Sequence, residues 1–103
     1  MKSRGLSGNN ELPIKEQEVE IINKYGLHAR PAMQLVELAN QFSARIELSN
    51  GSLTVDAKSI MSVMRLAATK GSTLNILTDG EDAEQALTSM TGLFSDGFGE
   101  MDE

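Results

Sequence analysis

The stretch ARIELSNGSLTVDA, residues 44–57, twice alternates apolar with polar side chains, with a turn signal between the two runs. The apolar positions are Ala44, Ile46, Leu48, Leu53 and Val55. Alternation with a period of two is typical of a half-buried β-strand. Asn50-Gly51 between the runs is the strongest two-residue signal for a hairpin turn. The stretch therefore predicts two antiparallel strands that cover a core with one face.

Upstream of this hairpin the sequence predicts a strand and then a helix. The stretch EVEIINK, from Glu18, alternates like a half-buried strand. From about Ala29 to Gln41 apolar residues recur at spacings of three and four, which places them on one face of a helix. These helical apolar positions are Ala32, Leu35, Val36 and Ala39. Residues 1–16 are polar and without periodicity, so we expect a flexible N-terminal extension followed by one folded domain over 17–103.

Downstream of the hairpin the pattern predicts a short helix, a strand and a last helix. Ser59 is a suitable N-cap for the short helix. Its expected apolar stripe comprises Ile60, Val63, Met64 and Ala67. Leu74 and Ile76 mark the strand, which Asp79-Gly80 closes. The expected core face of the last helix comprises Ala83, Ala86, Leu87, Met90 and Phe94.

The predicted order of elements is βαββαβα, and three short helices can cover only one face of a four-stranded sheet. We therefore expect an α/β (α+β) fold, an open-faced β-sandwich. The hairpin requires at least one antiparallel pair, but periodicity alone leaves the strand order open.

Composition excludes several classes of function. The 103 residues contain no cysteine, so thiolate metal sites, thiol nucleophiles and disulfides are excluded. No apolar run approaches the roughly 18 residues that a membrane span needs, and no signal peptide is visible, so we expect a cytoplasmic protein without membrane insertion. A net charge of −6 disfavours nucleic acid as a partner. A single histidine without a carboxylate cluster also disfavours a metal site, and we expect no cofactor.

That histidine, His28, lies in NKYGLHARPA at the junction of the first strand and the first helix. It could be an exposed turn residue without a role. The N-terminus of a helix, however, favours an anion, and the guanidinium of Arg30 can donate two hydrogen bonds to phosphate oxygens. Neutral imidazole is a nucleophile near pH 7. Together these groups suit a phosphoryl group carried on nitrogen, and a hydrolytic triad is disfavoured because no nucleophile-elbow motif is present.

GLHARPA followed by KSIMSVMRLA, with the ending LFSDGFGE, resembles HPr, the histidine-containing phosphocarrier family of the phosphoenolpyruvate-dependent sugar phosphotransferase system. The resemblance covers about Glu18 to Glu100. It implies that Enzyme I phosphorylates His28 on Nδ1, that Arg30 balances the charge, and that the group passes to EIIA domains. It implies a phosphoryl carrier and not a self-sufficient enzyme, and we expect a monomer.

The resemblance also implies roles for the segment Lys58–Met61. Ser59 would be the regulatory serine that HPr kinase/phosphorylase modifies in organisms that have this enzyme, although a serine here is also an ordinary helix cap. Ile60 and Met61 are adjacent, so they cannot both face one core stripe and at least one should be exposed. Scattered exposed apolar residues are common, but the resemblance implies a docking patch for Enzyme I and EIIA domains.

Two alternatives to the sugar carrier stay open at the level of sequence. The first is a regulatory binding module that acts mainly through phosphorylation of Ser59. The second is a carrier in a nitrogen-regulatory branch of the phosphotransferase system, which would use the same histidine chemistry.

Overall fold

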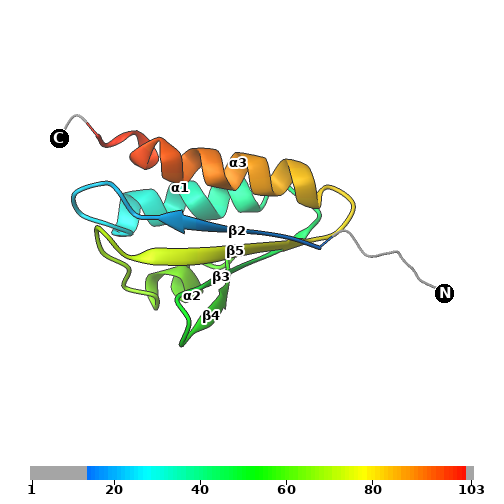
Figure 1. Ribbon diagram of the computed structural model, residues 1–103, viewed down its shortest axis with the longest axis horizontal. Coiled ribbons are helices and arrows are strands. Elements are labelled where there is room, and N and C mark those ends of the chain that lie inside the picture. The colour runs from blue at the N-terminus through cyan, green and yellow to red at the C-terminus, as the bar shows by residue number, and fades with distance from the viewer. Residues whose placement is uncertain (1–13, 102–103) are drawn as a thin grey trace.

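The computed structural model describes residues 14–101, which form a four-stranded antiparallel sheet and three α-helices (Figure 1). The strands are β2 (Ile14–Glu20), β3 (Arg45–Ser49), β4 (Thr54–Asp56) and β5 (Thr73–Asp79). The helices are α1 (Ala29–Ala39), α2 (Ile60–Met64) and α3 (Ala83–Ser95), and a 3₁₀ turn, η1 (Gly97–Gly99), follows. The expected order βαββαβα and the open-faced sandwich are confirmed.

The strand order, which the sequence left open, is β2-β5-β3-β4. β5 lies between β2 and β3 and pairs antiparallel with both. The last strand in the sequence is therefore a central strand of the sheet. Helices α1 and α3 lie side by side over one face of the sheet (Figure 1). None of the helices within residues 14–101 is long and apolar enough to cross a membrane.

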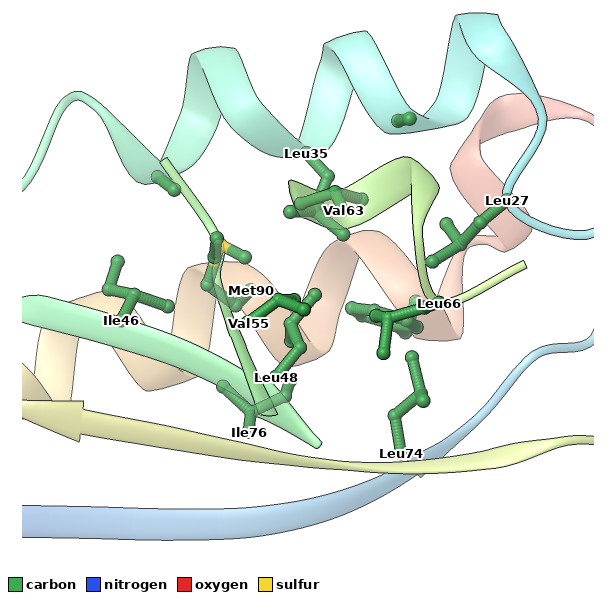
Figure 2. Packing of buried hydrophobic residues seen from close by; sticks show 14 of the residues in the cluster. Leu27, Leu35, Ile46, Leu48, Val55, Val63, Leu66, Leu74, Ile76 and Met90 are labelled. Atoms are coloured by element: carbon green, nitrogen blue, oxygen red, sulfur yellow. The ribbon is translucent and has the colours of Figure 1, made fainter. Parts of the chain in front are cut away.

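The core lies between that sheet face and the helices. Figure 2 shows Leu35 of α1 and Val63 of α2 pointing toward Leu48 and Ile76 of the sheet, and all four side chains are fully buried. The expected core face of α3 is confirmed, except that Leu87 is only partly buried.

The hairpin is confirmed, with its turn shifted by one residue. Leu48 pairs with Val55, and the backbone N–H of Asn50 donates to the carbonyl of Leu53 (3.1 Å), so Asn50 is the first residue of the turn and not a central one. Its side-chain Oδ1 accepts from the N–H groups of Ser52 and Leu53 at 2.9 and 2.8 Å. An Asx-type bond of this kind closes the turn.

The first strand differs from the prediction. β2 begins at Ile14 and ends at Glu20, so Ile14–Glu16, expected in the extension, belong to the strand, while residues 1–13 lie outside the described residues. The alternation is weak because β2 is an edge strand in which only Val19 is even partly buried. Helix α1 also ends two residues early, at Ala39, where the side-chain amide of Asn40 donates to the carbonyl of Val36.

The predicted apolar stripe of α2 is wrong except at Val63. Ile60 and Met64 are exposed, and the buried positions are Val63 and, beyond the helix, Leu66 and Ala68. The helix ends at Met64, and the chain then turns through Ala67, whose φ is +47°. A left-handed residue breaks the 3.6-residue period, so the helical spacing no longer applies after Met64.

A carboxylate ties the start of α3 to the start of β3. Asp82 accepts from the backbone N–H groups of Ser43 (2.9 Å) and Ala44 (2.8 Å). The hydrogen bonds from the backbone N–H groups of Ser43 and Ala44 lower the pKa of Asp82 below its usual value despite partial burial. Asp82 therefore fixes the start of α3 against the start of β3 through these two amides.

Candidate functional site

His28 lies where the loop after β2 meets α1. It is the N-cap residue of α1, with extended backbone angles (φ −77°, ψ −173°), and its side chain makes no capping hydrogen bond. The imidazole remains 40% exposed. A group on this ring would therefore lie at the positive end of the helix dipole, where an anion is stabilised.

Gly26 brings the histidine loop against the segment after α2. Its φ is +66°, and a Cβ there would overlap the carbonyl oxygen of Ala68. The backbone N–H of Leu27 donates to that same oxygen at 3.0 Å, and the Leu27 side chain is buried. Only glycine permits the backbone at position 26 to lie this close to Ala68, and this contact fixes the position of the residues before His28.

An aromatic ring packs beside the histidine. The ring of Tyr25 lies edge-on to that of His28, with centroids 6.1 Å apart and an interplanar angle of 89°. The Nζ of Lys24 lies 5.2 Å from the centroid of the Tyr25 ring. The tyrosine side chain is itself largely exposed, so one side of His28 is lined by a surface aromatic ring.

The carboxylate of Glu100 joins the histidine to the arginine. His28 Nε2 lies 3.1 Å from Oε1 and 3.0 Å from Oε2 of this carboxylate. Arg30 donates to Oε2 from Nε (3.0 Å) and from Nη2 (2.6 Å), and Asn23 Nδ2 donates to Oε1 at 3.0 Å. The Glu100 side chain is only 1% exposed, so both oxygens depend on these three donors.

The turn after α3 delivers this glutamate. Gly97, Phe98 and Gly99 have φ values of +60°, +58° and +74°, three successive left-handed residues. The ring of Phe98 is buried and packs on Phe94 with centroids 5.0 Å apart. A non-glycine residue in this conformation is costly, and burial of the aromatic ring offsets that cost. This turn places the Glu100 carboxylate beside the start of α1, within reach of His28 and Arg30.

The electrostatics of the site favour an ionised glutamate. Burial would raise the pKa of Glu100, but the hydrogen bonds from Arg30, His28 and Asn23 outweigh it and hold the pKa below the usual value. Asn23 is itself fully buried, and its Nδ2 also donates to the carbonyl of Gly26 at 2.9 Å. Within residues 14–101 its Oδ1 has no hydrogen-bond partner, so the contribution of Asn23 here is as a donor.

The structure thus brings the two predicted site residues together. His28 and Arg30 share one carboxylate, although they were expected to converge on an incoming anion. No group of three or more histidine, cysteine or acidic side chains that could hold a metal exists among residues 14–101. The chemistry available is that of a partly exposed imidazole beside a guanidinium and a buried anion.

The segment around Ser59 is close to what the sequence predicts locally. Ser59 is the N-cap of α2, and its Oγ accepts from the N–H of Ser62 at 3.3 Å, which confirms the cap. Ile60 is 36% and Met61 76% exposed, so the expectation of at least one exposed apolar residue is confirmed. Met33 of α1 is also exposed, and Met33 and Ile60 line one shallow apolar hollow.

Sequence reasoning missed Glu100, Asn23 and Tyr25 as members of the site. Glu100 was noted only as part of a family-like ending, since it lies 72 residues from His28 along the chain. A usable signal was present in DGFGE, where two glycines flank a phenylalanine immediately before an acidic residue. Such spacing indicates a tight reversal that places the acidic side chain at a defined position.

Comparison with known proteins agrees with this geometry. The family model for the phosphorylation site of the PTS HPr component matches residues 15–96. The phosphocarrier protein HPr of Cupriavidus necator is 45% identical over 82% of this chain and 96% of its own length, and that of Pseudomonas aeruginosa is 43% identical over 81% and 93%. A crystal structure of HPr from Thermoanaerobacter tengcongensis has a TM-score of 0.81 and 41% identity, covering 84% of this chain and 97% of that one. The chain belongs to the HPr family of phosphocarrier proteins.

Proposed function

We propose that the chain carries a phosphoryl group on Nδ1 of His28, accepting it from phospho-Enzyme I and passing it to EIIA domains of the sugar phosphotransferase system in the cytoplasm. The observation that carries this proposal is the partly exposed His28 at the start of α1, joined to Arg30 through one buried carboxylate. The phosphoryl donor is ultimately phosphoenolpyruvate. The protein is a substrate of its partners and does not turn over a substrate alone.

The exposure of the site suits a carrier. A group that must enter from one protein and leave to another cannot be enclosed, and a carrier that bound it too strongly would not release it. One exposed guanidinium at a helix N-terminus supplies charge stabilisation without enclosure. Arg30 therefore stabilises the phosphoryl group while leaving its far side open to the next acceptor.

Partner docking is assigned to exposed apolar side chains of α1 and α2. Ile60 and Met61 of α2 and Met33 of α1 are exposed, and Met33 and Ile60 line one apolar hollow; these three residues are the proposed docking patch. Methionine adapts to surfaces of different shape, which suits a protein with several partners. Ser59 at the edge of this patch is the residue on which HPr kinase/phosphorylase would act, and the monomer is the proposed working form.

The test is to incubate the protein with phosphoenolpyruvate and Enzyme I. One acid-labile phosphoryl group is expected on His28, and His28→Ala should abolish it while the circular dichroism spectrum stays unchanged. Arg30→Ala should slow loading by one to three orders of magnitude, roughly the effect of losing a charge-assisted contact in the transition state. Arg45→Ala is the control, because Arg45 also pairs with two carboxylates but lies on β3 away from the site. Labelling of the His28→Ala variant would refute the assignment.

A further inference from the structure

The hydrogen bond between His28 and Glu100 defines which ring nitrogen carries the proton. An ionised carboxylate has only acceptors, so a ring nitrogen 3.0–3.1 Å from both of its oxygens must be the donor. That nitrogen is Nε2. Within residues 14–101, Nδ1 has no hydrogen-bond partner, so in the neutral ring its lone pair is available for reaction.

We propose that Glu100 is a positioning residue that keeps the proton on Nε2 of His28 while the phosphoryl group is loaded and unloaded. The inference rests on the proposed function and deepens it, because it explains why one nitrogen accepts the group and why the group leaves again. Glu100 does not touch the phosphoryl group in this scheme and acts only through the ring.

Loading then needs no change in protonation. The Nδ1 lone pair forms the new N–P bond while the bond from phosphorus to the donor phosphohistidine of Enzyme I breaks and its electron pair stays on the donor nitrogen. The Nε2 proton remains in place, so the ring of the product carries a positive charge. That charge lies against the Glu100 carboxylate, whose contact with Nε2 is therefore strengthened as the bond forms.

The hydrogen bond between Glu100 and Nε2 matters more when the phosphoryl group leaves His28 than when it is loaded. When the Nδ1–P bond breaks, its electron pair returns to Nδ1, and phosphorus bonds to a nucleophile of the next protein. With the proton kept on Nε2, the leaving group is neutral imidazole. Without it the leaving group would be the imidazolate anion, which is far more basic and departs more slowly. By keeping the proton on Nε2, Glu100 thus favours transfer of the phosphoryl group from His28 to the next protein.

The surroundings of Glu100 are built to hold an anion. Arg30 and Asn23 donate to it, and the left-handed turn through Phe98 places it. The hollow that it lines with Ile22 and Met101 is flanked by Lys24 and Lys70. The hydrogen bonds from Arg30 and Asn23 favour the ionised carboxylate, and a protonated carboxyl could no longer act only as an acceptor.

The experiment is ¹⁵N NMR of His28 in the intact unphosphorylated protein, with the pH raised until the ring signals stop changing, so that the neutral ring is observed. Since His28 is the only histidine, its two ring nitrogens give an unambiguous spectrum. The wild type should show a protonated Nε2 and an unprotonated Nδ1 in the neutral form. Glu100→Gln should show a mixture of tautomers, because an amide can donate or accept and so fits either one. Glu81→Gln, an exposed change with the same loss of charge, is the control and should match the wild type.

The second measurement is the rate at which the loaded protein passes its phosphoryl group to an EIIA domain. Glu100→Gln should slow this step by roughly 10–100-fold, the usual effect of losing a group that orients an imidazole. A neutral wild-type ring protonated on Nδ1 would overturn the inference without any variant. So would a Glu100→Gln protein with wild-type tautomers and rate. If Enzyme I does not load His28 at all, the proposed function fails, whereas the NMR result still reports on Glu100.

Discussion

Replacing Gly26 by alanine should damage both the stability of the fold and the position of His28. The added Cβ would overlap the carbonyl oxygen of Ala68 and lie 2.9 Å from the Cα of Thr69. Both neighbours are backbone atoms, so no side chain can rotate away to make room. Relief requires moving the loop, and that breaks the 3.0 Å hydrogen bond from Leu27 to the same oxygen.

The magnitude follows from two separate costs. Alanine at a φ of +66° costs about 1–2 kcal/mol relative to glycine. Overpacking against fixed backbone adds about 1–3 kcal/mol. The sum, about 2–5 kcal/mol, is a large part of the 5–15 kcal/mol that stabilises a typical domain. For a domain of this size it should lower Tm by roughly 10 °C or more.

Gly71→Ala is the matched control. Gly71 also has a positive φ, +90°, but nothing lies within 4 Å of its added Cβ. Its backbone is farther from the left-handed minimum than that of Gly26, so its conformational strain is at least as large. Any extra loss at position 26 therefore measures the contact with the segment after α2.

The assay is urea denaturation of both variants, together with the initial rate of phosphoryl loading by Enzyme I. Gly26→Ala should be the less stable variant and should also load more slowly, because His28 lies two residues from the displaced backbone. Gly71→Ala should load at the wild-type rate. Equal stability of the two variants would refute the argument that close approach, and not φ alone, requires glycine at position 26.

Three further predictions concern other parts of the molecule. Asp82→Asn should lower Tm at pH 7. Folding depresses the pKa of Asp82, so the carboxylate stabilises the folded state above the usual carboxyl range and this stabilisation is lost as pH falls through the depressed pKa. The difference in Tm between variant and wild type should therefore vanish in acid. A difference that persists at the acid end would contradict this linkage. Phe98→Ala should cost about 3–5 kcal/mol in the free energy of unfolding and also slow loading, since the buried ring anchors the turn that places Glu100; wild-type stability on denaturation would contradict that anchoring. Ser59→Asp should leave Tm level or raise it, because a carboxylate suits a helix N-terminus, yet should slow loading by Enzyme I through charge at the docking patch. Ser52→Asp in the hairpin turn is its control, and an unchanged loading rate would remove the inhibitory role of Ser59.

Much of the fold could be predicted because a strand or helix that buries only one face has apolar residues at a regular spacing in the sequence. The hairpin and α3 are such cases, since Leu48, Val55 and Met90 are all buried as their spacing indicates. β2 was placed too late because an edge strand with both faces exposed has no strong alternation. α2 was assigned the wrong stripe because the helix ends at Met64, after five residues of which only Val63 is buried, and so short a helix gives little periodicity to interpret.

The site was predicted only in part for a similar reason. His28 and Arg30 are two residues apart and share a recognisable local motif. Glu100 reaches them through a tertiary contact, and no periodicity links residues that far apart in the chain. Local sequence therefore indicated the proposed phosphorylation site, while the carboxylate that contacts the histidine could be identified only from the folded structure.

A phosphoryl carrier must both accept and give up one phosphoryl group. The most direct measurement is to load the protein with labelled phosphoenolpyruvate and Enzyme I, remove both, and mix the product with an EIIA domain alone. We expect the label to leave His28 and appear on the EIIA domain, and added unlabelled carrier to accept part of it again. Label that stays on His28, or is released only as inorganic phosphate, would contradict it.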